Sequence, residues 1–213
     1  MTSAESKGPN AGKGKAFFER ADQVADTGNW DFAIEMYLEG IKREPENLER
    51  GHKPLRKVSI NRKAQGGKPA GMIDQLKHRT GKDPVQNLAN AEYMLSKDPG
   101  SVQHMLAVLQ YARKCQLPEV TGWIASIVLE SQRQAKKPSK RILVELVNAF
   151  EETKDFTQSV QACDMAMNVD PNDGELRERF RSLSALYTIK QGKFEEEGDF
   201  TKGVADMDGQ KKL

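Results

Sequence analysis

Apolar and small residues recur every three or four positions over most of the chain. One stripe runs from Phe17 to Ala25 and a second from Phe32 to Ile41, with Gly28 and Asn29 between them and Pro45 beyond. This spacing is typical of amphipathic helices, and Gly-Asn and Pro interrupt or end them. The first part of the chain therefore predicts two antiparallel helices joined by a tight turn.

The same pattern returns further along the chain. Residues 142–150 and 156–167 form a second pair of stripes, separated by a Lys-Asp turn and closed by Pro171. Between the two pairs, residues 101–114 and 118–134 form a third, with Pro118 suited to the first position of a helix. A last amphipathic stretch covers residues 174–190, and alternation typical of strands is almost absent.

The first and last pairs read as copies of one unit. Residues 28–47 and 154–173 both begin with a turn-like pair and an aromatic residue and end in an acidic residue, Pro and Asn. These units resemble the tetratricopeptide repeat (TPR) of bacterial-type proteins, a helix-turn-helix of about 34 residues. In the first copy the family's positions fall on Phe17, Ala21, Val24, Gly28, Ala33, Tyr37, Gly40 and Pro45. In the last copy they fall on Leu143, Val147, Phe150, Lys154, Ser159, Cys163, Ala166 and Pro171.

The resemblance implies an all-α, TPR-like α-solenoid of stacked helical hairpins. We expect about four units, the second irregular, followed by a C-terminal capping helix. We also expect Gly28, Ala33, Gly40 and Ala166 to lie at close helix contacts. The predicted layout is a disordered lead over 1–14, a helical repeat domain over 15–190 and a polar tail over 191–213. Within the domain the segments are 15–45, 46–99, 101–137, 139–171 and 174–190.

The segment between the first two repeats is strongly basic. From Arg50 to Lys82 there are ten Lys or Arg residues and a single acid, Asp74, whereas the net charge of the whole chain is only +2. We treat residues 50–82 as an insertion, in which Gly66, Gly67, Pro69 and Gly71 prevent a continuous helix. The four cations proposed to contact a partner are Arg56, Lys57, Arg62 and Lys63.

Three interpretations of this basic segment remain open. It is a solvated insertion or a basic loop paired with acids elsewhere in the same chain, a site for an acidic protein, or a site for nucleic-acid phosphates. The segment contains no Phe, Tyr or Trp on which unpaired bases could stack, which places nucleic acid below a protein partner.

No residue pattern indicates catalysis, a cofactor, a metal ion or a small-molecule substrate. His52, His78 and His104 are each 26 residues apart, and Cys115 and Cys163 lack metal-ligand spacing, so the cysteines are expected to be reduced and packed. No apolar run of membrane-spanning length and no signal-peptide core are present, which favours a cytoplasmic protein.

The surface of the repeats is the remaining place for function, because stacked helical hairpins form a concave groove that holds peptides. Where one branch of the TPR family uses Lys and Asn to clamp a carboxylate, this chain has Phe18 and Asp22, which suit an apolar or basic ligand. The predicted function is a non-enzymatic scaffold that binds an acidic or extended segment of another protein. The alternatives are an RNA- or ribosome-associated factor acting through 50–82, and the interaction domain of a larger enzyme or regulator.

Overall fold

The computed structural model describes residues 8–209 of the chain, with side chains described for residues 8–192. Every regular element in this part of the chain is a helix. The chain divides into two compact units, the first ending at Ser131 and the second beginning at Gln132, near the end of α7.

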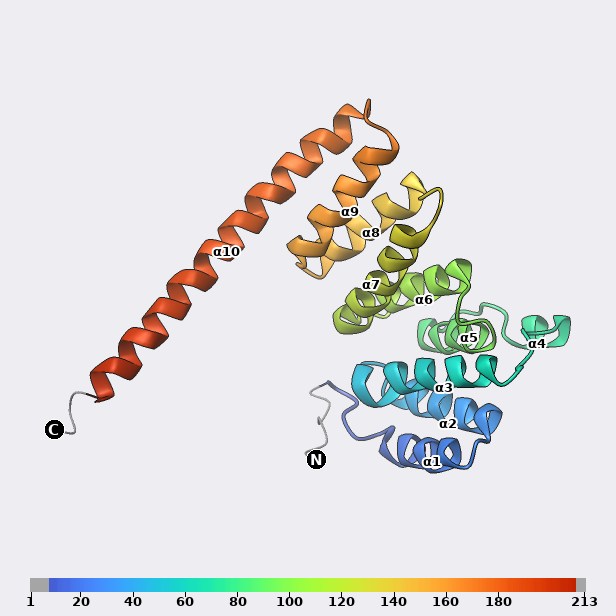
Figure 1. The fold of residues 1–213 in the computed structure, drawn as a ribbon. Helices are drawn as coiled ribbons and strands as arrows, with labels where there is room; N and C mark the ends of the chain where they lie inside the picture. The colour runs from blue at the N-terminus through green and yellow to red at the C-terminus, as the bar shows by residue number, and fades with distance from the viewer. Residues whose placement is uncertain (1–7, 210–213) are drawn as a thin grey trace. The chain divides into compact units, whose positions relative to one another are not determined.

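The elements are α1 (Lys15–Asp26), α2 (Trp30–Arg43), the π-helical turn η1 (Leu48–His52), α3 (Lys53–Ala64), α4 (Met72–Lys77), α5 (Pro84–Lys97), α6 (Val102–Lys114), α7 (Pro118–Gln134), α8 (Lys140–Glu152), α9 (Phe156–Val169) and α10 (Gly174–Gly209). Figure 1 shows them in chain order, and the predicted all-α, TPR-like class of helical hairpins is confirmed. Among the described residues, no helix has both the length and the apolar character needed to cross a bilayer.

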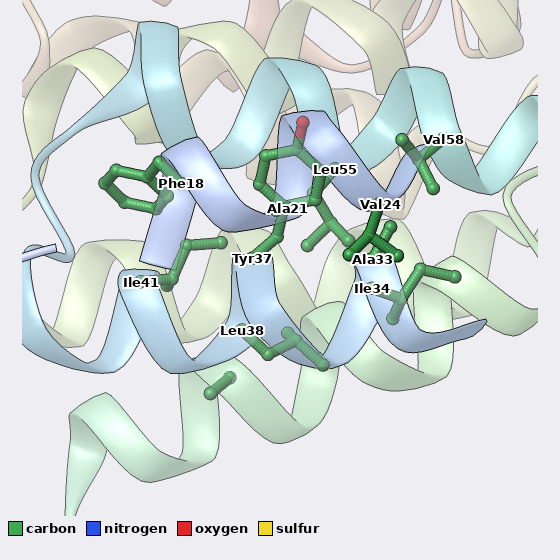
Figure 2. Packing of buried hydrophobic residues seen from close by; sticks show 11 residues of the cluster. Phe18, Ala21, Val24, Ala33, Ile34, Tyr37, Leu38, Ile41, Leu55 and Val58 are labelled. Carbon is green, nitrogen blue, oxygen red and sulfur yellow. The ribbon is translucent and has the colours of Figure 1, made fainter. Parts of the chain in front are cut away.

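The first hairpin, α1 and α2, supplies most of one hydrophobic cluster of the first unit, to which α3 and α5 add residues. Ala21 and Ala33 are fully buried where the two helices pack, as the repeat pattern predicted, and Tyr37 lies beside them (Figure 2). The Asn29 side chain caps the start of α2 by accepting a hydrogen bond from a backbone N–H. Gly28 has a φ of +77° and no atom near its missing Cβ, so it serves the turn and not a close helix contact.

Phe18 occupies a socket made by glycines. A Cβ added to Gly40 would lie 2.3 Å from the Phe18 ring, one added to Gly14 would lie 2.6 Å from it, and one added to Gly51 would lie 3.3 Å from it. These glycines come from the residue before α1, from α2 and from η1; Gly14 and Gly40 leave no room for a side chain beside the ring, and at Gly51 the contact would be tight. Gly40 thus lies at a close contact, as expected, and Phe18 is only 1% exposed.

The two helices of the second repeat, α3 and α5, do not run antiparallel as the helices of a hairpin do. His52, just before α3, bonds Glu92 within α5, and Lys63, near the end of α3, pairs with Asp98 at the end of α5. The two helices therefore run parallel, and residues 65–83 form a crossover that contains α4 (Figure 1). Both α3 and α5 pack against α2, so α3 is a structural helix of the core, and the inserted segment is shorter than the predicted 50–82.

Glycines and a proline end α3 and open the crossover, as the sequence indicated. Gly66 has a φ of +85°, and the Gly67 N–H donates to the Arg62 carbonyl at 3.0 Å. A Cβ on Gly67 would lie 2.8 Å from that same carbonyl oxygen, so glycine is required where the chain turns back on the helix end. The chain then resumes a helix only at Met72.

Residues 8–14 were expected to be disordered, but they form consecutive turns that are bonded to the loop after α2. Glu44, only 1% exposed, accepts a hydrogen bond from the Gly14 N–H at 3.0 Å, and Glu46 accepts one from the Asn10 N–H at 2.7 Å. The two carboxylates satisfy backbone donors that precede α1, which gives this polar stretch a fixed path. Residues 1–7 of the predicted lead lie outside the described part of the chain.

The second unit contains the hairpin of α8 and α9, with α10 packed on α9. Phe150, Cys163 and Ala166 are fully buried in it, in agreement with the repeat pattern. Lys154 adopts a φ of +57° at the turn, the conformation for which the family has glycine. The last helix was expected to end at Lys190, but it continues to Gly209, because this stretch contains no proline to stop it. The backbone of 191–209 is therefore helical where the sequence predicted a polar tail.

Candidate interaction surface

Half of the ten cations of the basic segment are already paired with acids or carbonyls of the same unit. The Arg62 Nε lies 2.8 Å from an oxygen of Asp31, and the Lys97 Nζ binds that same oxygen at 2.5 Å. Lys63 pairs with Asp98, and the Arg56 guanidinium donates to the Pro99 carbonyl at 3.3 Å. These contacts tie α3 to α2 and to the turn after α5.

Asp31 is the centre of this pairing. Burial pushes the pKa of the Asp31 carboxyl upward, but hydrogen bonds from Lys97 and Arg62 outweigh it and hold the pKa below its ordinary value. Arg56 is also directed inward: burial lowers the pKa of its guanidinium, and the neighbouring Glu92 partly opposes that change. Of the four cations proposed as partner contacts, only Lys57 is exposed without an ion pair in the described part of the chain.

Beside Arg56 lies a buried polar pair, His52 and Glu92, that no sequence pattern predicted. His52 Nδ1 is 2.7 Å from an oxygen of Glu92, and His52 Nε2 is 2.9 Å from the Pro45 carbonyl oxygen. A carbonyl only accepts, so Nε2 must carry a hydrogen, and one further proton lies between Nδ1 and the carboxylate. The Trp123 ring of α7 covers the imidazole with its centroid 6.3 Å away. With both ring nitrogens bonded inside the core, this histidine stabilises the fold.

The groove residues taken from the TPR pattern also have structural roles. Phe18 is buried in its glycine socket, so almost none of its ring is exposed to a ligand in this structure. Asp22 accepts a hydrogen bond from the Tyr37 hydroxyl at 2.5 Å and pairs with Arg50 at 3.0 Å. Its carboxylate is therefore neutralised by the chain itself.

The crossover, by contrast, contains a surface that no described residue of the unit covers. The polar side of α4 is anchored to α5: the Tyr93 hydroxyl donates to Asp74 at 2.9 Å, and the His78 ring stacks on Tyr93 at 3.7 Å. The backbone of the segment is held as well, because the Asn90 amide donates to the Arg79 carbonyl at 3.0 Å. Hydrogen bonds from the Gly71 N–H and then from Tyr93 hold the pKa of Asp74 below its ordinary value.

The other side of α4 is apolar and faces solvent. Met72, Ile73 and Leu76 are 87%, 71% and 65% exposed. At about 100° per residue these three positions share one side of the helix, and Asp74 and His78 lie on the opposite side. This arrangement is the reverse of an ordinary surface helix, which turns its apolar side to the core.

Four cations accompany these apolar side chains. Lys68, Lys77, Arg79 and Lys82 are exposed, and none of them forms an ion pair with any described residue. We call Met72, Ile73 and Leu76, together with these four cations, the α4 surface. The sequence analysis predicted only an insertion without a continuous helix here, because the six residues of α4 are too few to show helical periodicity. The "MIDQL" pattern was the only available signal.

Comparisons with known proteins add little to this picture. The chain matches no protein-family model. It also matches no curated protein by sequence. Similar solved structures include residues 41 to the end of MamA from Desulfovibrio magneticus RS-1, with 11% identity, 98% of this chain and 100% of that chain covered, and a TM-score of 0.39. A structure of MamA from AMB-1 has 15% identity, 92% and 91% coverage and a TM-score of 0.39. Such scores do not indicate a shared arrangement of helices, so the fold assignment depends on the helices of this chain itself.

Proposed function

We propose that the chain is a non-catalytic protein-interaction module and that its partner docks on the α4 surface. The observation that carries this proposal is the outward direction of Met72, Ile73 and Leu76 on a helix whose polar side is anchored to α5. A cluster of large apolar side chains held in water is unfavourable unless another surface covers it. The α4 surface replaces Phe18 and Asp22 as the candidate binding site.

The size of the apolar cluster indicates a modest affinity. Full burial of such a side chain is worth roughly 1.5–3 kcal/mol, so three of them contribute about 5–9 kcal/mol before costs. Association itself costs at least about 4 kcal/mol. Apolar contact alone would therefore give weak binding, and the neighbouring cations must add to it if the complex is to be stable.

The ion pairs that η1 and α3 form within the unit reduce the support for the nucleic-acid alternative. Arg50, Arg62 and Lys63 have acidic partners within the unit, so they contribute little net positive potential at the surface. Apart from Lys57, the cations of the basic segment that have no ion pair with a described residue flank the apolar side chains of α4, which suit a protein surface better than a row of phosphates.

The test replaces Ile73 and Leu76 with Ser. It compares the proteins that the double variant and the parent chain capture from an extract of the source cells. Both side chains are exposed, so the variant should keep the helical circular dichroism of the parent chain. We expect it to lose the partners that the parent captures. Ile189→Ser, at a residue 57% exposed on α10, is the matched control and should retain them. Retention of every partner by the double variant, with or without nuclease, would exclude the α4 surface as the docking site.

A further inference from the structure

We infer that the segment docking on the α4 surface is acidic and amphipathic, with large apolar side chains bordered by Asp or Glu; this inference rests on the proposed function. The first reason is charge. Lys68, Lys77, Arg79 and Lys82 surround the apolar side chains and have no ion pairs with described residues.

The acids close to these cations in sequence are committed to other contacts. The carboxylate of Asp74 accepts hydrogen bonds from the Gly71 N–H at 2.9 Å and from the Tyr93 hydroxyl at 2.9 Å. The carboxylate of Asp83 caps the start of α5 by accepting from the Val85 N–H at 2.9 Å. These donors are neutral, so both carboxylates keep their negative charge, but four cations against two acids still leave a net positive charge for a partner to neutralise.

The second reason is the arrangement of the apolar groups. They form one narrow stripe on a single helical turn, with Lys77 directly beside it in the sequence. A complementary surface is a stripe of large apolar side chains with acids at its edges, which is what an acidic amphipathic segment presents. Met72, the most exposed of the three, is a flexible side chain that adapts to the shape of a partner.

Two other anionic surfaces fit less well. Unpaired bases need aromatic rings to stack on, but the Tyr93 ring is already covered by His78. Binding to a membrane surface depends on the apolar area that is buried, and a six-residue helix with three apolar side chains offers little.

The experiment measures fluorescence anisotropy of a labelled 14-residue peptide of Glu, Asp, Leu and Phe, with Leu and Phe spaced to form one helical stripe. Two control peptides carry Lys in place of the acids, or Ser in place of Leu and Phe. The full chain is used, with Ile73→Ser, Leu76→Ser and a Lys77→Gln/Arg79→Gln variant. The matched controls are Ile189→Ser and Lys136→Gln/Lys137→Gln, which alter exposed residues of the second unit. Vesicles of phosphatidylcholine with phosphatidylserine, and a single-stranded uridine oligonucleotide, are measured alongside.

We expect the acidic amphipathic peptide to bind at least tenfold more tightly than either control peptide. Each α4 variant should weaken its binding about tenfold or more, the control variants should leave it unchanged, and binding should weaken as salt rises from 50 to 500 mM. Equal binding of the basic peptide, or preferential binding of vesicles or oligonucleotide, would overturn the acidic-partner inference. Its failure is separable from that of the proposed function, because capture of natural partners depends on Ile73 and Leu76 whatever the partner's charge.

Discussion

Removing the His52 side chain should strongly destabilise the first unit. The imidazole is fully buried and bonded to a carboxylate that is itself 3% exposed, so His52→Ala leaves Glu92 in the core without its nearest hydrogen-bond donor. Breaking a buried pair of this kind costs about 3–5 kcal/mol. Glu92→Gln has nearly the same shape, and its amide can donate to Nδ1 while Nε2 continues to donate to the Pro45 carbonyl. We expect Glu92→Gln to cost about 1 kcal/mol, the ordinary worth of one hydrogen bond.

Urea unfolding followed by tryptophan fluorescence measures the free energy of unfolding of the first unit, in which both substitutions lie. The chain has two tryptophans, Trp30 and Trp123, and both belong to the first unit. His104→Ala is the control, because this partly exposed histidine of α6 lies outside the buried pair, and its loss should change stability by less than about 0.5 kcal/mol. A cost below 1 kcal/mol for His52→Ala, or a cost for Glu92→Gln that equals it, would show that the buried pair does not stabilise the core as argued.

Two further predictions concern the packing and the charges around α2. Gly40→Ala should overpack the Phe18 socket and cost about 1–3 kcal/mol, because the added Cβ would lie 2.3 Å from the ring. Gly100→Ala, whose added Cβ would meet no atom within 4 Å, should leave the urea midpoint nearly unchanged, and equal midpoints for both variants would argue against the socket. Asp31 has a lowered pKa in the folded chain, so its stabilising effect should be full above the unfolded value of about 4 and disappear as pH falls through the folded one. The stability difference between the parent and Asp31→Asn should therefore shrink from pH 6 to pH 3, and a constant difference would contradict the pairing with Lys97 and Arg62.

The regular helices could be predicted from the sequence because their signals are local. The stripe through Ala21 and Val24, the turn at Gly28 and the end of α2 before Pro45 all depend on spacing and backbone preference along a few residues. Ala33 and Ala166 were expected at close helix contacts, and both are fully buried. These features need no knowledge of which helix lies opposite.

The roles of individual side chains could not be predicted in the same way. The TPR pattern placed Phe18 in the groove. Its burial could not be predicted because the glycines that enclose its ring come from three separate segments of the chain. Arg62 and Lys63 looked free because the acids that neutralise them, Asp31 and Asp98, are more than 30 residues away. The parallel direction of α3 and α5 could not be predicted either. Composition shows where the connection between them lies, but not whether the chain begins α5 beside the start or the end of α3.

That crossover has a consequence for how the first unit evolves and folds. A simple row of helical hairpins can assemble stepwise between sequence neighbours, but α5 reaches α2 and α3 only after the long connection has closed. The entropy cost of closing a flexible loop rises slowly, by about 0.6 kcal/mol for each doubling of its length. Residues 68–82 can therefore change in length or sequence with little effect on the helices they connect, as long as Gly66 and Gly67 end α3 and Asp83 caps α5. The α4 surface lies on this segment, so the chain can acquire new binding specificities while the sequence of its core stays the same.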